Sequence, residues 1–259
     1  MDTSSLTRTE REVWSELVTE QLAPCPNVPS SLADCVKSHA PCAACRPAAD
    51  LLAKQVQRGK SKSAAERFYH ARFDPKSRVN VDIAGSPSKG PDNAPITLVE
   101  WADFECAFCQ KASPVLEEQR ERLKDKVRLV FKHFPIAKHV NATALAKFAI
   151  AAENQGKFWE AHALLFTGAG GTLDESTLGM LCQKLGLDPV KVKEDMASKA
   201  TEERLARERK QADELGLKGT PFMFINGVKF DFDLFDLEED LPVWLNTELE
   251  ILTGSPVKP

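Results

Sequence analysis

Two cysteines separated by two residues are the part of this sequence best suited to chemistry. Residues 106–109 read Cys-Ala-Phe-Cys, at the point where an extended run, residues 96–105, gives way to a helical pattern. A cysteine at a helix N-terminus meets unpaired backbone N–H groups and the positive end of the helix dipole, which favour the thiolate over the thiol. Cys109 follows closely enough to form a disulfide with Cys106. This placement predicts a redox-active thiol–disulfide site.

The spacing of Cys106 and Cys109 also suits a structural disulfide or one half of a zinc site. A zinc site needs four ligands, and no second pair of cysteines or histidines follows at zinc-finger spacing. We therefore predict no metal ion at this pair. Thiol–disulfide exchange also needs no cofactor, because the cysteines themselves carry the electrons.

Four further cysteines crowd into residues 25–45, which also hold three prolines. These four cysteines are Cys25, Cys35, Cys42 and Cys45. They suit two disulfides that hold a small helical module, a second redox pair, or a four-cysteine zinc site, and the spacing does not choose among these. Such crowding favours an oxidising compartment.

The composition is that of an ordinary globular protein. Of 259 residues, 42% are apolar, and 38 acids against 34 bases give a net charge of −4 without a charged block. This dispersed charge argues against a nucleic-acid groove or an anionic membrane surface, and favours protein or small-thiol partners. No window approaches the roughly 18 apolar residues of a membrane span. The first residues lack the apolar core of a signal peptide. The crowded cysteines nevertheless favour an oxidising compartment. We therefore expect a leader that is absent from this sequence, and a periplasmic or otherwise exported protein.

The first part of the chain predicts a small, cysteine-rich helical module over residues 1–76. Thr7 and Glu10 form a capping-box pattern ahead of an amphipathic helix, and Ser63 and Glu66 form a second one. Helices are expected over residues 6–22, 47–57 and 64–73, followed by a short strand over 79–83. The apolar stripe of the first helix needs a partner surface, either the cysteine-rich module or a second copy in a homodimer.

The second part, residues 77–259, predicts an α/β domain. Beyond the strand that ends near Glu105, we expect a helix over 107–123 kinked at Pro114, a strand over 127–134, and a helical insertion over about 138–215. Asn226 and Gly227 predict the turn of a hairpin over 222–230. A helix over 234–252 closes the chain. Strand, helix and strand in succession imply parallel pairing with a right-handed crossover.

This order of elements, from about residue 80 to 252, resembles the DsbA-like family of thiol–disulfide oxidoreductases, and so implies a thioredoxin fold carrying a helical insertion. The matching stretches are residues 99–109, 131–136, 156–162 and 219–227. The resemblance implies that Cys106 is the partly exposed attacking thiolate and Cys109 the buried resolving cysteine. It also implies cysteine-containing protein substrates and a redox partner that recycles the pair.

The same resemblance assigns three more site residues. Pro221 would be cis and face the disulfide, leaving the backbone of Thr220 to pair with an extended substrate. Glu100 would be a buried acid beneath Cys109, where a raised pKa suits it to relay a proton. Phe108 is a candidate for holding unfolded substrate segments.

Two departures from the best-known family pattern bear on the direction of exchange. Ala107 and Phe108 place no histidine between the cysteines to stabilise the thiolate, which predicts a weaker oxidant. Thr220 ahead of the proline resembles disulfide isomerases. Oxidase, isomerase and reductase therefore all stay open, as does the alternative of a peptide-binding chaperone or cytochrome c maturation assembly protein with a structural disulfide.

The N-terminal module resembles the helical CcmH-type domain of cytochrome c maturation, on Cys42-Ala-Ala-Cys45 and the helical segments after it. That resemblance implies a second redox pair formed by Cys42 and Cys45. Cys182 lies in an apolar stripe and is expected to be a buried free thiol. The histidines at 133, 139 and 162 are expected to be structural.

Overall fold

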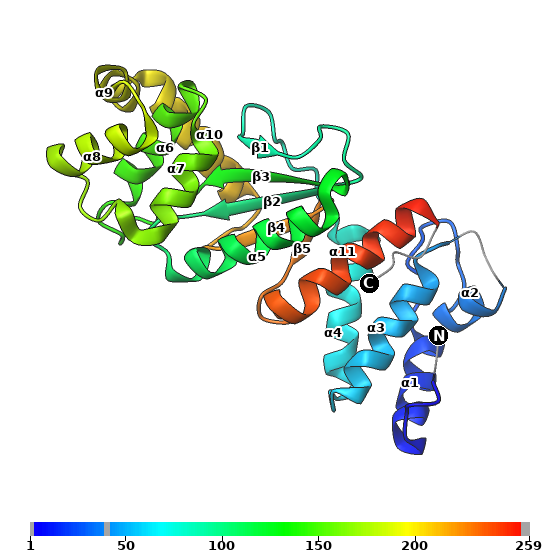
Figure 1. The fold of residues 1–259 in the computed structure, drawn as a ribbon. Coiled ribbons are helices and arrows are strands. Elements are labelled where there is room, and N and C mark those ends of the chain that lie inside the picture. The colour runs from blue at the N-terminus through cyan, green and yellow to red at the C-terminus, as the bar shows by residue number, and fades with distance from the viewer. Residues whose placement is uncertain (1–2, 39–41, 255–259) are drawn as a thin grey trace. The chain divides into compact units, whose positions relative to one another are not determined.

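The structure, a computed structural model, describes residues 3–38 and 42–254 (Figure 1). Contacts divide the chain into two compact units. The first joins the residues up to Val81 with those from Phe224 onward, and the second spans Asp82–Met223. The sequence-based domain limits, 1–76 and 77–259, stay a prediction. Among the described residues, no helix is both long and apolar enough to cross a bilayer.

The second unit is built on a sheet with strand order β1-β3-β2-β4. β2 (Ile96–Ala102) runs parallel to β3 (Val127–His133), with Glu100 opposite Phe131. β1 (Ser88–Lys89) is antiparallel to β3, and β4 (Phe222–Ile225) begins in this unit. The expected α/β thioredoxin-type order is thus present.

Helices surround this sheet in the second unit. α5 (Ala107–Leu123) follows β2 directly and contains Pro114 without ending there. The inserted helices are α6 (Ala142–Asn154), α7 (Phe158–Leu164), α8 (Glu175–Leu185), α9 (Pro189–Ala197) and α10 (Lys199–Glu214), with a π-helical turn at Leu165–Ala169 and a 3-10 turn at Lys124–Lys126 before β3. Of these, α6, α7, α8 and α9 gather beyond the C-terminal ends of β2 and β3 (Figure 1). The predicted helical insertion is therefore confirmed.

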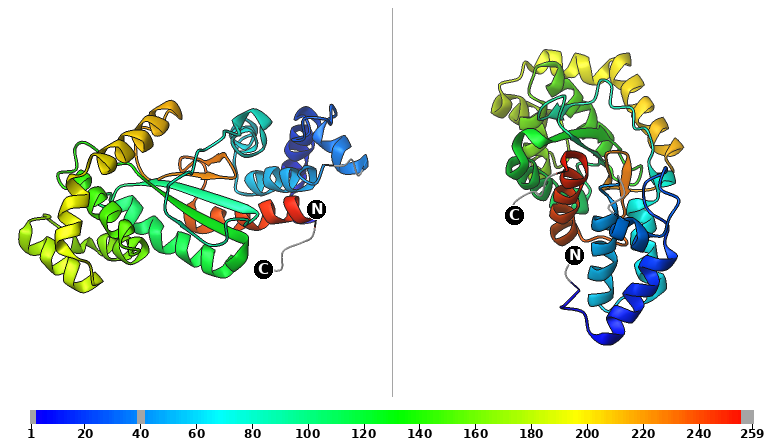
Figure 2. Two further views of the ribbon diagram at one scale, coloured as in Figure 1. Left: turned by 90° about the horizontal axis from the view of Figure 1, so that it is seen from above. Right: turned by 90° about the vertical axis from the view of Figure 1, so that its right-hand side faces the viewer.

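α5 and α10 lie on opposite faces of the sheet (Figure 2). Adjacent residues of a strand point to opposite faces. Accordingly the indole of Trp101 donates to the carbonyl of Glu208 on α10 at 3.4 Å, whereas Glu100 lines a cavity with residues of α5. Cys106 and Cys109 belong to the buried cluster that also holds Phe104 and Phe131.

The expected strand over residues 79–83 does not form. Val79, Val81 and Ile83 are half-buried in alternation with exposed residues, which is why they suggested a strand. Of these, Val79 donates a backbone hydrogen bond to the carbonyl of Gly227, and no ladder follows. The prediction was wrong because an alternating pattern makes a strand only where a neighbouring strand offers a continuous edge.

In the first unit, helices pack around the cysteine-rich segment. They are α1 (Arg8–Glu20), α2 (Leu32–Ser38), α3 (Cys45–Gln57), α4 (Lys62–Phe73) and α11 (Leu237–Thr253), with a 3-10 turn at Pro75–Ser77 and the short strand β5 (Val228–Phe230). The capping box of Thr7 and Glu10 is confirmed. The cap expected at Ser63 was wrong, because the side chain of Ser61 caps α4 instead.

The apolar stripe of α1 is covered within the first unit. Leu17 and Val18 are buried, and the indole of Trp14 donates to the carbonyl of Ala49 on α3 at 3.0 Å. The helix was expected to pack either on the cysteine-rich module or on a second copy of the chain. The structure shows it packed on the module. A homodimer stays a prediction.

The hairpin and α11 complete the first unit. Asn226 and Gly227 form the predicted turn with positive φ, and a Cβ at Gly227 would lie 2.2 Å from the carbonyl oxygen of Val79, so only glycine fits there. The guanidinium of Arg72 on α4 lies 4.6 Å from the ring of Trp244 on α11 and donates to its carbonyl. These contacts hold α11 against α4.

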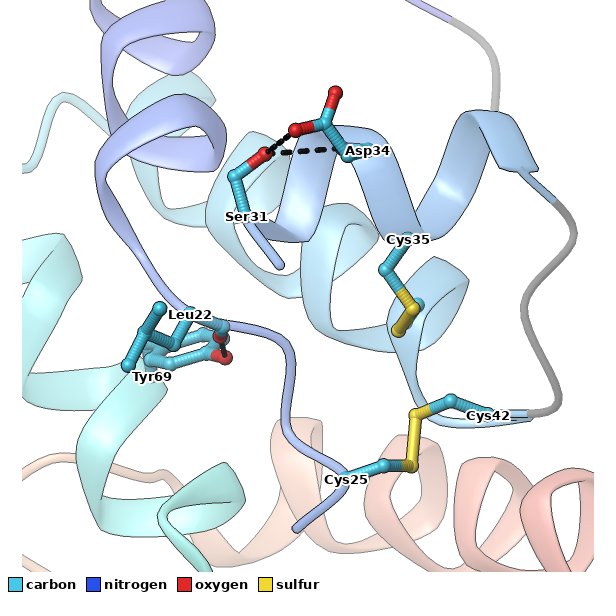
Figure 3. The surroundings of a disulfide bond; sticks show 8 residues. Leu22, Cys25, Ser31, Asp34, Cys35, Cys42 and Tyr69 are labelled. Atoms are coloured by element: carbon cyan, nitrogen blue, oxygen red, sulfur yellow. Dashed lines mark hydrogen bonds between the residues drawn. A yellow bond between two sulfur atoms is a disulfide. The ribbon is translucent and has the colours of Figure 1, made fainter. Parts of the chain in front are cut away.

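The N-terminal cysteines form two disulfides, Cys25–Cys42 and Cys35–Cys45 (Figure 3). The bonds link α2 and the segment before it to the start of α3. Of the three uses considered for these cysteines, the structure contains the pair of disulfides. A disulfide between Cys42 and Cys45, as the CcmH-type resemblance implied, is wrong, because each of these sulfurs is bonded elsewhere.

Candidate active site

Cys106 is placed by the junction between β2 and α5. The strand ends at Ala102, and Cys106 is the N-cap residue of α5 in an extended conformation. Its backbone N–H donates to the carbonyl of Asp103 at 3.0 Å, and its carbonyl accepts from Gln110 at 3.0 Å. No side chain caps this helix. The first N–H groups of α5 are thus available to the sulfur of Cys106.

The surroundings of Cys106 favour its thiolate. A hydrogen bond from Cys109 is the largest influence and outweighs the opposing effect of burial, and the amides of Phe108 and Cys109 add to it, so the pKa of Cys106 falls to about 5. At neutral pH the sulfur is therefore ionised. The residue is only 6% exposed, which corrects the expectation of a partly exposed cysteine: the residue is enclosed by its own helix and by Thr220.

Cys109 has the opposite character. It is fully buried in the first turn of α5. Burial raises the pKa of its thiol, and the hydrogen bond to Cys106 and the nearby charge of Glu100 raise it further. Two cysteines three residues apart are thus made unequal, with Cys106 held as a thiolate and Cys109 as a thiol.

Glu100 is a buried carboxyl group beside this pair. It is 2% exposed, and its Oε1 has no hydrogen-bond partner. Burial, and secondarily the charge of Cys106, raise the pKa of Glu100 to about 8. The carboxyl group is therefore mainly protonated at neutral pH and changes its charge close to it.

Glu100 faces a cavity of about 430 Å³ between α5 and α7. The wall includes Trp159, Phe166 and His162, whose Nε2 has no partner, while Lys89 and Glu117 add charged groups. Burial lowers the pKa of His162 to about 3, so its ring is neutral. The cavity has room for water beside Glu100.

The loop before β4 reaches the cysteine pair through Thr220. The Sγ of Cys106 lies 3.3 Å from the carbonyl oxygen of Thr220, to which the thiol form donates. The Thr220–Pro221 peptide bond is cis. The hydroxyl of Thr220 is buried without a partner. Cys106, Cys109, Glu100 and Thr220 thus form one site.

Two acids that sequence reasoning missed tie this site to the loop after β3. Asp103 is 2% exposed, and its Oδ2 accepts from the backbone of Ile136 and meets His139 Nδ1, each at 2.8 Å. Glu105 accepts from the backbone and side chain of Asn141. They flank Phe104 immediately before Cys106. This closeness in sequence to Cys106 was the signal that could have identified both acids as site residues. That His139 is structural stays a prediction.

Phe108 is the exposed member of the motif. Its side chain is 70% exposed, beside the buried Cys106, and Lys111 Nζ lies 5.9 Å from its ring. The exposed ring of Phe108 thus lies in sequence between the two sulfurs of the pair.

Residues 97–241, more than half of the chain, match the family model described as the DSBA-like thioredoxin domain. A Na(+)/H(+) antiporter NhaA 1 of Salinispora arenicola (strain CNS-205) is 38% identical over 152 residues, which cover 58% of this chain and 23% of the antiporter. The chain thus spans less than a quarter of the length of this curated relative.

Solved structures show the same fold. A thioredoxin-like oxidoreductase from Silicibacter pomeroyi DSS-3 is similar with a TM-score of 0.52 and 26% identity, over 60% of this chain and 87% of that one. Oxidised BdbD from Bacillus subtilis is similar with a TM-score of 0.56 and 21% identity, over 68% and 97% of the two chains.

Proposed function

Because this chain belongs to the DSBA-like thioredoxin domain family, we propose that it is a thiol–disulfide oxidoreductase that exchanges disulfides with protein substrates through Cys106 and Cys109. The observation that carries this proposal is the opposite shift of the two sulfurs, with the pKa of Cys106 lowered to about 5 and that of Cys109 raised. A structural disulfide needs no such inequality.

In the reducing direction, the thiolate of Cys106 attacks one sulfur of a substrate disulfide. The substrate S–S bond breaks, its second sulfur leaves with the electron pair, and a mixed disulfide forms at Cys106. Cys109 then loses its proton and attacks Cys106, so that the Cys106–Cys109 bond forms and the substrate leaves as a dithiol. The oxidising direction is the reverse sequence, and our proposal covers both.

Glu100 handles the proton of Cys109. The negative charge of Cys106 contributes to the raised pKa of Glu100. When Cys106 enters a mixed disulfide that charge disappears, so the pKa of Glu100 falls and its carboxylate becomes a base at the moment Cys109 must be deprotonated. Glu100 then releases this proton to solvent through the neighbouring cavity.

The substrate lies across the exposed rim of the site. Phe108 supplies an apolar contact, and the Thr220–Pro221 segment supplies backbone groups for an extended peptide. A separate redox partner restores the starting state of the cysteines. The two disulfides of the first unit support an oxidising location, periplasmic or otherwise exported.

Replacement of Cys109 tests the proposal. A Cys109→Ala variant mixed with a disulfide-bonded protein substrate is expected to accumulate a mixed disulfide at Cys106, because the resolving sulfur is gone. Non-reducing electrophoresis and peptide mapping detect it. The matched control is Cys106→Ala, which should trap nothing. Peptide binding by Cys109→Ala without any trapped disulfide would contradict the proposal and favour a binding module.

A further inference from the structure

The two N-terminal disulfides lie close enough to react with each other. The sulfurs of Cys35, Cys42 and Cys45 all lie within 4.8 Å of one another, although they belong to two different bonds. Figure 3 shows the bond of Cys35 beside the Cys25–Cys42 bond. A movement of up to about 3 Å would bring sulfurs of the separate disulfides to the S–S bond length of about 2 Å.

The four sulfurs differ in their access to solvent. Cys35, Cys42 and Cys45 are buried, at 2%, 7% and 2% exposure, whereas Cys25 is half-buried. Cys25 also lines an apolar groove of about 660 Å³, together with Leu22, Pro24 and Tyr69. A reductant that approaches through this groove meets Cys25 before the other three sulfurs.

We propose that these disulfides form an internal exchange relay, a second redox site that accepts two electrons from a protein dithiol at Cys25. In the first step a thiolate of the dithiol attacks Cys25, and Cys42 leaves with the electron pair of the broken bond. The second thiol of the dithiol then displaces Cys25 from the mixed disulfide. The dithiol is oxidised to a disulfide, and Cys25 and Cys42 are reduced.

In the second step the thiolate of Cys42 attacks Cys35. The Cys35–Cys45 bond breaks, a Cys35–Cys42 bond forms, and Cys45 leaves as a thiolate. No electrons enter or leave in this step, because one S–S bond replaces another. The free thiolate is thus on Cys45 instead of Cys42.

The position of Cys45 favours this outcome. It is the first residue of α3, whose N-cap residue, Ala44, makes no side-chain hydrogen bond and whose first turn holds no acid. In the first turn Pro47 has no N–H, and the amides of Cys45 and Ala48 donate to the carbonyls of Cys42 and Ala44. The amide of Arg46 and the positive end of the helix dipole are left to stabilise a negative sulfur there. Since a thiol that ionises more easily leaves faster, attack on Cys35 with departure of Cys45 is preferred over the opposite attack.

The relay gives the first unit a role of its own. It requires no reaction at Cys106, so it stands apart from the proposed function of that site. Under this inference the disulfides do more than stabilise the helices. Reduction at the half-buried Cys25 leads to a thiolate on Cys45 at the start of α3.

A Cys25→Ser variant tests the second step in isolation, because it leaves Cys42 without its partner. After incubation at neutral pH and quenching with iodoacetamide, peptide mapping is expected to find label on both Cys42 and Cys45, together with a Cys35–Cys42 peptide. The appearance of label on Cys45 should have a rate independent of protein concentration, as an intramolecular step requires. If, among the four N-terminal cysteines, Cys42 alone carried label and Cys35–Cys45 stayed intact, the relay would be overturned.

The matched control is Cys42→Ser, which removes the attacking sulfur and leaves Cys25 unpaired. Among the four N-terminal cysteines, the label should here appear on Cys25 only, since Cys25 is not among the three clustered sulfurs. Partial reduction of the unsubstituted protein with limiting dithiothreitol gives a second test that does not depend on the folding of the variants. Its one-disulfide intermediates should include Cys35–Cys42, and their complete absence would overturn the proposal.

Discussion

Two Cys-x-x-Cys motifs in this chain have the same spacing and different fates. Cys106 and Cys109 are both free cysteines, whereas Cys42 and Cys45 are each bonded to a cysteine further back in the chain. The motifs differ in their phase relative to the helix. Cys106 is the N-cap of α5, so Cys109 falls in the first turn, but in the other motif Cys45 is the first helical residue and Cys42 lies outside the helix.

This difference in phase explains the difference in chemistry. In the 106–109 motif one helix N-terminus acts on the first sulfur and burial acts on the second, which makes an attacking and a resolving cysteine. In the 42–45 motif the helix start acts on the second sulfur, and the first is left to bond with Cys25. The spacing of two cysteines therefore predicts redox activity only when their place on the helix is also known.

The largest expected effect that separates the two motifs comes from Cys106→Ala. We expect it to lower the rate of disulfide exchange with a protein substrate by on the order of a thousandfold, because the attacking sulfur is lost. Turbidity of reduced insulin measures the rate. The double variant Cys35→Ala/Cys45→Ala should retain most of the exchange activity. Equal losses of exchange activity in both variants would contradict the difference in chemistry between the two motifs.

Glu100→Gln should change the pH dependence of stability. The pKa of Glu100 in the folded protein, about 8, lies above the ordinary 4.5, so the unfolded chain loses this proton first and stability falls as the pH rises between those values. Removing the charge should therefore stabilise the reduced protein by up to about 5 kcal/mol at pH 9 and much less at pH 5.

Urea unfolding of reduced Glu100→Gln and of the unsubstituted protein at both pH values measures this difference. The exposed Glu118 of α5 provides a control, since Glu118→Gln should alter stability little at either pH. The exchange rate of Glu100→Gln should also lose its inflection near pH 8. An unchanged pH profile together with unchanged stability would remove Glu100 from the site.

Removal of an N-terminal disulfide should lower stability while sparing catalysis. The Cys25–Cys42 bond joins residues 17 positions apart, and a loop of that length corresponds to about 3 kcal/mol in the chain-entropy description. A Cys25→Ala/Cys42→Ala variant is thus expected to unfold at lower urea concentration, with the exchange rate at Cys106 little changed. A comparable loss of exchange activity would show that the first unit serves the catalytic pair.

The smallest effect concerns substrate contact. Phe108→Ala should raise the KM for a disulfide-containing peptide severalfold and leave kcat nearly unchanged, because the exposed ring contributes binding rather than chemistry. Steady-state kinetics separate the two constants. Val190→Ala, an exposed apolar residue on α9, is the control and should change neither. A fall in kcat alone would place Phe108 in the reaction instead.

The sequence predicted the parts of this molecule that depend on local signals. The change from extended to helical pattern at Cys106, the Asn226-Gly227 turn and the Thr7–Glu10 cap each depend on neighbouring residues, and all three are present. Glu100 was found through a resemblance, because a single acid in a strand carries no sign of its burial.

The rest depends on contacts between distant residues. The bonds of Cys25 and Cys35 could not be chosen, since four cysteines allow three pairings. The attachment of Asp103 to His139 needs the loop after β3 to return beside the site. The alternating residues around Val81 lacked a partner strand, which no local pattern reveals.

A glutathione redox titration of the purified protein tests the central claim most directly, with the state of each cysteine determined by thiol labelling and peptide mapping. If Cys106 and Cys109 form an exchanging catalytic pair, their disulfide should open between about −120 and −220 mV, the range of enzymes that exchange disulfides with proteins. A pair that stayed oxidised below about −300 mV would behave as a structural disulfide and would contradict the proposed function.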